Sequence, residues 1–268
     1  MKNKLTAAPY LVWMVVFIAV PLLMIAVFAF TSNDGSFTLK NIQDAGQYAN
    51  IFFRSIWLSV IATAICLVVS YPVSFFLSRM EKHRQATMLM IVMLPMWMNF
   101  LLRTYAWMTL LGNNGVINHL LGLIGIGPVK LINTSGAVVL GMVYNYLPFM
   151  ILPLYSVMVK IDKSVIEAAS DLGCSSFNTL FRVIVPLSLP GITSGITMVF
   201  VPAISTFIIS RMLGGGSNLL IGDLIEMQFL GNAYNPHLGA AISLVLMVII
   251  LVIMTVMNQF SPDDQVLI

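Results

Sequence analysis

Long hydrophobic runs, separated by short polar segments, occupy most of this chain. Six of the runs are long enough to cross a hydrocarbon core of about 30 Å as helices, because an α-helix rises about 1.5 Å per residue. They lie near residues 10–30, 56–77, 87–111, 136–159, 183–209 and 238–257. The pattern therefore predicts an all-α integral membrane protein with six transmembrane helices.

Prolines are expected to bend or break three of the predicted spans. Pro95 is expected to kink the third span, and Pro148 and Pro153 to break the fourth, because proline removes a backbone donor and crowds the preceding turn. The fifth span is expected to follow a bent path, because it holds three more prolines: Pro186, Pro190 and Pro202.

Polar segments connect the predicted spans. Residues 31–53 form a polar connection in which Asn33-Asp34-Gly35 signals a turn, and residues 79–84 form a tight basic loop. Residues 112–134 are rich in glycine and are expected to hold a short interfacial helix. Residues 214–236 form a second long polar excursion.

Composition supports one membrane domain over residues 1–268, without a soluble domain. Hydrophobic residues make up 59% of the chain and charged residues only 9%. The net charge of +3 is too small to suggest binding to nucleic acid. The first hydrophobic run follows a basic head like that of a signal peptide. It exceeds the roughly 7–15 residues of a secretory apolar region, which indicates a retained anchor.

A polar segment between the fourth and fifth spans has the pattern of two short helices. Ser164 and Glu167 have the spacing of a capping box, which predicts the start of the first helix. Ala168 and Ala169 keep that helix thin, so that another surface can approach its backbone. Gly173 is expected to end it in a left-handed cap. The next helix is then expected to be capped by Ser175 or Ser176.

The same segment resembles the EAA loop of the permeases of bacterial ABC importers. The family pattern is EAA, a glycine after three residues, and I-x-L-P after nine more; here Glu167 opens it, Gly173 follows, and Val183-Ile184-Val185-Pro186 closes it. Val183 and Val185 are conservative departures. The resemblance implies a coupling loop at about residues 160–186 that docks on a cytoplasmic ATPase through Glu167, Ala168, Ala169, Gly173 and Pro186. The alternative is an ordinary amphipathic loop between two spans.

Lysine and arginine predict the orientation of the chain. With a cytoplasmic N-terminus, eight of these residues fall in cytoplasmic segments and five on the outer side. This bias places residues 160–186 in the cytoplasm, as well as both termini of a multi-pass protein of a bacterial cell membrane. Cys66 and Cys174 then lie at different depths, so no disulfide is expected between them.

The chain carries no recognisable catalytic chemistry. It has no G-x-x-x-x-G-K-[ST] phosphate loop, so ATP has to be hydrolysed by another chain. Its histidines lie in three different loops without metal-ligand spacing, and no catalytic pair falls within a span. We therefore expect no enzyme, no metal and no cofactor. The rival class is a non-transport membrane sensor or an intramembrane enzyme.

Polar and aromatic residues inside two spans are candidates for a substrate path. Trp97 and Asn99 follow Pro95 about half-way along the third span, where polar groups usually face a cavity or another helix. Tyr144 and Asn145 lie in the fourth span. The alternative for the aromatic residues is an ordinary interfacial belt. Arg103 is expected to extend to the outer interface as an anchor.

Beyond the EAA loop, most of the chain resembles the spermidine/putrescine permeases of the PotB type. The segments that carry this resemblance are LPMWMNFLLRTYAW, VYNYLPFMILPLYS, EAASDLG and GGGSNLLIGDLIEMQFL. It implies a type I importer fold, a heterodimer with a second homologous permease, a cytoplasmic ATPase dimer, an extracytoplasmic binding protein and a polyamine as substrate. Permeases for molybdate, sulfate, iron or thiamine share this architecture and remain the alternative.

Overall fold

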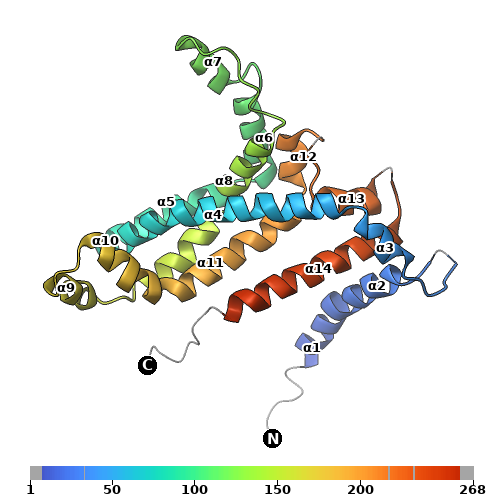
Figure 1. Cartoon of the computed structure of the whole chain (residues 1–268), viewed down its shortest axis with the longest axis horizontal. Helices are drawn as coiled ribbons and strands as arrows, with labels where there is room; N and C mark the ends of the chain where they lie inside the picture. Colours follow the sequence, from blue (N-terminus) through green and yellow to red (C-terminus); the bar gives the residue numbers. More distant parts are fainter. Residues whose placement is uncertain (1–7, 33, 217, 232, 260–268) are drawn as a thin grey trace, which may run out of the picture.

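The computed structural model describes residues 8–32, 34–216, 218–231 and 233–259, which fold as helices with one isolated antiparallel bridge between Thr31 and Phe37 (Figure 1). The basic head, Asn33 of the expected turn and the acidic tail lie outside the described residues. The helices are α1 (Ala8–Met14), η1 (Val15–Ala19), α2 (Val20–Ala29), α3 (Lys40–Gly46), α4 (Ala49–Arg79), α5 (Lys82–Trp97), α6 (Phe100–Leu111), α7 (Val116–Leu123), α8 (Ser135–Met158), α9 (Lys163–Asp171), α10 (Ser176–Thr179), η2 (Leu180–Ile184), α11 (Val185–Ser205), α12 (Ile208–Gly214), α13 (Ile221–Leu230) and α14 (Pro236–Gln259).

Five helical segments of the described chain are long and apolar enough to cross a membrane, and a bent pair makes a sixth. The bent pair joins α5 to α6 and α7, whose axes meet at 85°. The third span is therefore broken rather than kinked, and the break falls at Met98 and Asn99 instead of at Pro95. Pro95 does not interrupt α5, which continues through this residue to Trp97.

Helices α4, α8 and α11 pack against one another and form the centre of the molecule. Small side chains line the face of α4 that meets α8, spaced by three or four residues along the helix. They let the backbones approach closely, which is how helices associate where the surrounding lipid is as apolar as the side chains. The stripe consists of Ser55, Ser59, Ala62, Cys66, Ser70, Ser74 and Ser78, all buried.

Helix α8 is not broken by its prolines, contrary to the sequence-based expectation. Helix α8 runs through Pro148 and Pro153, and α11 runs through Pro190 and Pro202. Both helices are held on more than one side by neighbours in the central trio, and tertiary packing of this kind offsets the loss of single backbone hydrogen bonds.

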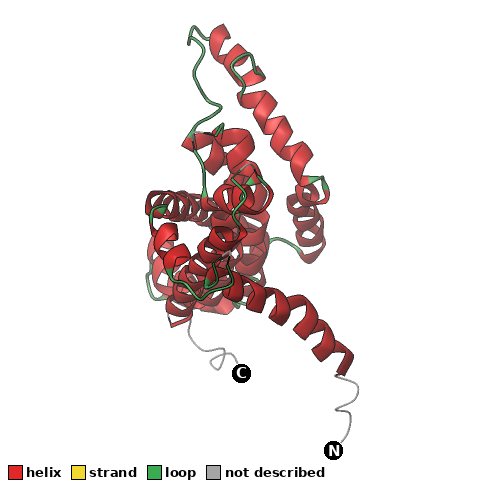
Figure 2. Cartoon of the chain, turned by 90° about the vertical axis from the view of Figure 1, so that its right-hand side faces the viewer, coloured by secondary structure: helices red, strands yellow, loops and turns green. Residues whose placement is uncertain are grey.

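A second core joins the two ends of the chain. Helix α14 packs against α2, α3 and α13, and buried residues from these helices and from α11 form one hydrophobic cluster. The first span, α1 to α2, exposes most of its surface and projects from the bundle toward the N-terminus (Figure 2). Residues 214–236, predicted as a polar connection, contain the partly buried helix α13.

Candidate functional site

Helix α9 of the predicted coupling loop begins at an aspartate rather than at the predicted serine. Asp162 is the N-cap, and its carboxylate accepts a hydrogen bond of 3.1 Å from the backbone N–H of Ser164. That bond holds the pKa of Asp162 below its usual range. The capping box between Ser164 and Glu167 is therefore wrong, because Ser164 already lies inside the helix and Glu167 is left with an exposed side chain.

The end of α9 is the glycine cap that the sequence predicts. Gly173 has a φ of +79°, in the left-handed region. Its N–H donates to the carbonyl of Ser170, and the N–H of Cys174 donates to the carbonyl of Ala169. These two bonds make a complete Schellman motif, which satisfies the last carbonyls of the helix.

The chain then turns directly into the next span. Ser175 caps α10 by accepting from the N–H of Asn178 at 3.3 Å, which confirms one of the two predicted caps. Helices α10, η2 and α11 continue without a break from Ser176 to Ser205. Pro186 lies inside this continuous helix, two residues after the π-helical turn η2, so it removes one backbone donor from the helix.

The two short helices present an apolar surface to their surroundings. Leu172 is 85% exposed and Phe177 is 69% exposed, and the ring of Phe177 lies 4.6 Å from that of Phe181. Glu167 and Ala168 are exposed beside them, whereas Ala169 is buried against the chain. Among the EAA residues, the first two are thus available to another protein and the third anchors the helix.

Hydrogen bonds fix this loop to the spans around it. Arg79, the last residue of α4, donates through Nη1 to the carbonyl of Ile161 at 3.0 Å, just before α9. The hydroxyls of Tyr71 and Ser188 are 2.9 Å apart and join α4 to α11. The chain just before α9 is thus tied to the end of α4, and α4 is in turn joined to α11.

The residues predicted for the substrate path do not converge. Trp97 is 77% exposed at the end of α5. Asn99 is the N-cap of α6, and its side-chain oxygen accepts from the N–H groups of Leu101 and Leu102 at 2.8 and 3.4 Å. Its amide therefore serves the break in the third span.

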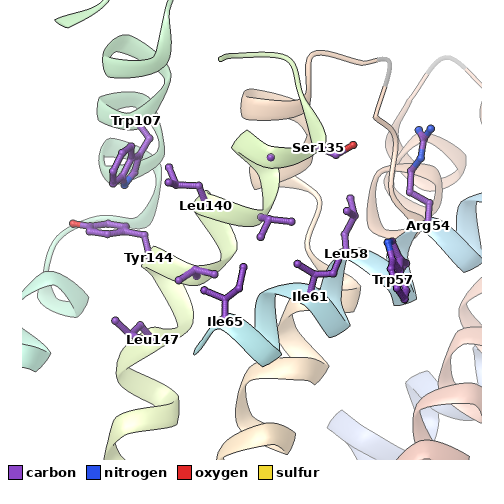
Figure 3. A pocket seen from close by; sticks show the side chains of 13 residues that line it. Arg54, Trp57, Leu58, Ile61, Ile65, Trp107, Ser135, Leu140, Tyr144 and Leu147 are labelled. Carbon is purple, nitrogen blue, oxygen red and sulfur yellow. The ribbon is translucent and has the colours of Figure 1, made fainter. Parts of the chain in front are cut away.

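Tyr144 lines a groove between α4 and α8 with a volume of about 850 Å³. Its ring meets Trp107 edge-on with centroids 5.4 Å apart, at the opposite end of the groove from Arg54 and Trp57 (Figure 3). Asn145 does not line this groove, because successive residues of a helix point about 100° apart.

Asn145 instead lines a separate cavity of about 460 Å³ together with Arg103. Arg103 is buried there, so its predicted role as an exposed anchor at the outer interface is wrong. The 85° bend explains the error: distances along α5 and α6 do not add along one axis, and α6 turns its first residues toward α8 and α11. No signal in the sequence distinguishes this inward position of Arg103.

The region after the fifth span holds a charged cluster. Arg211 on α12 pairs with Glu226 on α13 through both Nη atoms of its guanidinium, and Nη1 lies 3.2 Å from Oε1. Asp223 is buried in the first turn of α13, where its carboxylate accepts from the N–H of Leu220 at 2.9 Å. Burial raises the pKa of Asp223. Sequence reasoning placed both acids in a loop and missed this helix.

The candidate site contains no obvious metal-binding or redox group in the described part of the chain. No cluster of three or more metal-ligating side chains occurs there. Cys66, on the buried face of α4, and Cys174, after the cap of α9, are both free, as expected from their different depths.

The sequence matches a known family over almost its whole length. Residues 1–263 fit the family described as "Binding-protein-dependent transport system inner membrane component". The chain belongs to this family. It is therefore a multi-pass membrane component of binding-protein-dependent transport and not an enzyme.

Relatives and solved structures agree with this placement. The chain is 38% identical to the spermidine/putrescine transport system permease protein PotB of Haemophilus influenzae, over 92% of this chain and 90% of that protein. It is also 38% identical to PotB of Escherichia coli, over 88% and 90%. Its fold matches a bacterial ABC transporter involved in alginate import, with a TM-score of 0.80 and 17% identity over 96% of this chain and 93% of that one. The predicted type I importer permease fold is confirmed.

Proposed function

We propose that this chain is the permease subunit of an ATP-driven importer that carries polyamines. The observation that supports the cargo is the 38% identity to spermidine/putrescine permeases over about nine-tenths of both chains. In this proposal the chain pairs with a second homologous permease, receives cargo from an extracytoplasmic binding protein, and is driven by a cytoplasmic ATPase dimer.

The coupling loop at 160–186 is the proposed contact with the ATPase. Its exposed Leu172, Phe177 and Phe181 form an apolar surface at the beginning of the fifth span, and exposed apolar patches of this kind mark interaction sites. Glu167 and Ala168 border that surface, Ala169 and the cap at Gly173 hold its shape, and Pro186 lies in the span that would carry the motion inward. Closure of the ATPase dimer would press on α9, and the bond from Arg79 to Ile161 would pass the movement to α4.

The cargo path in this proposal uses aromatic faces. Trp97 presents an exposed indole at the break of the third span, and Tyr144 with Trp107 forms an aromatic pair on α8 and α6. Each cation–π contact with an ammonium group is worth about 0.5–2 kcal/mol, which suits a path that has to release what it carries. These contacts do not offset desolvation of several ammonium groups, so the acidic groups come from the second permease.

Uptake by vesicles that contain the complete complex tests this function. Labelled spermidine or putrescine is expected to accumulate with ATP, whereas sulfate, molybdate and thiamine are not. Trp97→Ala is expected to lower polyamine uptake several-fold with unchanged assembly, because one cation–π contact is lost. Lys130→Ala, at an exposed residue of the 124–134 loop, is the control. If the vesicles took up an anion and did not take up spermidine, the proposed cargo would be wrong, but the chain would still be an importer subunit.

A further inference from the structure

A buried cation lies on the cavity between α6, α8 and α11, without a counter-charge from the part of the chain that the structure describes. Arg103 is only 8% exposed, and its Nε and Nη1 atoms have no hydrogen-bond partner within the described residues. Its one aromatic contact is with Phe100, whose ring centre is 5.9 Å from the guanidinium carbon. A charge inside a membrane protein is costly unless it is paired.

A second polar side chain on the same cavity is also incompletely bonded. Asn145 is 3% exposed, and its Nδ2 donates to the carbonyl of Gly141 at 2.8 Å. Its Oδ1 has no partner within the described residues. The remaining wall of the cavity is largely apolar: Met96, Phe100, Tyr146, Phe149, Met198 and Pro202. Two buried polar side chains therefore line one cavity, and three of their atoms have no hydrogen-bond partner within the described residues.

The described part of the chain does not supply the missing anion. No acidic residue lines the cavity, and the ion pairs of Arg84 with Glu81 and of Arg211 with Glu226 do not involve Arg103. Asn145 is the eleventh residue of the 24-residue span α8, about 15 Å from its first residue and about 20 Å from its last at the rise of an α-helix. That depth is near the middle of a hydrocarbon core, where lipid phosphates do not reach.

We propose that this cavity receives a carboxylate side chain from the second membrane subunit. The guanidinium would donate charge-assisted hydrogen bonds to that carboxylate, the strong form of this contact. The carbonyl oxygen of Asn145 repels a carboxylate, so it confines the anion to the Arg103 side of the cavity. The inference rests on the proposed function, because that function supplies the second permease. Arg103 itself would repel the cationic cargo of the importer.

Charge reversal in the complete complex tests the contact. This chain carries an affinity tag, and the amount of second permease retained with it is measured. Arg103→Glu is expected to lower retention about tenfold or more, because breaking a buried pair leaves a charge unpaired. In the second permease, each aspartate and glutamate within a span is changed in turn to arginine, and one such change is expected to restore retention. Lys130→Glu, at an exposed lysine, is the matched control.

If Arg103→Glu fails to insert into the membrane, a double-mutant cycle with neutral variants tests the same contact. Arg103→Gln and the neutralised partner residue are expected to weaken retention by similar factors that do not multiply when combined. The inference would be overturned if Arg103→Gln retained the second permease fully, or if no change in the second permease restored its retention by Arg103→Glu. An increase in KM for an anionic cargo, with retention unchanged, would overturn it too and make the cavity a cargo subsite. If the wild-type complex takes up no polyamine but the paired charge changes still restore retention of the second permease, only the proposed cargo is contradicted.

Discussion

Gly173 is the residue on which the shape of the coupling loop depends most directly. Its φ of +79° is one that residues with a Cβ adopt at a cost, and β-branched residues most of all. No atom lies within 4 Å of where its Cβ would be, so the requirement for glycine comes from the backbone and not from crowding. The glycine of the EAA pattern therefore has a physical role in this chain.

We expect Gly173→Val to uncouple the permease from its ATPase. The valine would strain the Schellman motif and shift α10 relative to α9, which lowers ATPase stimulation by the complex. Gly173→Asn is the matched control, because asparagine tolerates the left-handed region. ATPase activity and co-purification of the ATPase are the measurements, and equal stimulation by both variants would contradict the assignment.

Asp223 gives the molecule a pH-dependent contribution to stability. Burial raises its pKa above the ordinary value of 3.8, so the folded chain holds this proton more tightly than the unfolded chain. The contribution to folding is greatest below the ordinary pKa and is lost as pH rises through the raised pKa.

Asp223→Asn is expected to gain stability relative to the wild type as pH rises from about 4 to 8. The amide stays neutral throughout and does not pay the cost of a buried charge. Melting temperatures of the detergent-purified complex at several pH values provide the test. Asp34→Asn, at an exposed aspartate, is the control. A constant difference between Asp223→Asn and the wild type at every pH would contradict the prediction.

At the scale of elements, the central trio depends on small residues that allow close approach. Gly191 and Gly195 lie four residues apart on α11, on the face that meets α8. A Cβ at Gly191 would lie 3.0 Å from the carbonyl oxygen of Pro153, and one at Gly195 would lie 2.6 Å from Sδ of Met150. The first neighbour is backbone, so it yields less easily than the second.

Gly191→Leu is expected to destabilise the permease by about 1–3 kcal/mol, the usual cost of overpacking. Gly122→Leu is the control, because no atom lies within 4 Å of its Cβ position on α7. Thermal unfolding in detergent compares the two variants. Equal melting temperatures for Gly191→Leu and the wild type would show that α8 and α11 do not approach as described.

At the scale of the whole molecule, the coupling surface and the basic loop lie on the same end of the bundle. Helices α9 and α10 occupy the end of α4 opposite to α3 and α13 (Figure 1). Arg79 closes α4 at that end and binds Ile161, so the basic loop at 79–84 and the coupling loop share one membrane face. Excess lysine and arginine favour the cytoplasm for that face.

Cysteine labelling is expected to confirm this orientation. In a background without Cys66 and Cys174, Lys82→Cys and Ser176→Cys should be protected from an impermeant thiol reagent in intact cells. Tyr234→Cys, at a residue 70% exposed before α14, should react from outside. Reaction of Ser176→Cys from outside would contradict both the orientation and the contact with an ATPase.

Local rules were sufficient for much of this protein. Span length follows from hydrophobic runs, and the ends of short helices follow from caps formed within a few residues, as at Gly173 and Ser175. The same reasoning chose Ser164 as the cap of α9 where the structure uses Asp162, because both residues have suitable side chains two positions apart.

Only the tertiary structure decided which faces of the helices meet. The prolines of α8 and α11 stay within continuous helices because neighbouring spans support them, whereas the third span breaks at Asn99, which caps the new helix. Tyr144 and Asn145 are adjacent in sequence yet line different cavities, since one residue turns a helix by about 100°. Arg103 became a buried, unpaired cation because of an 85° bend between two helices. Such a bend depends on contacts between distant segments, which hydrophobic patterning along a single chain does not record.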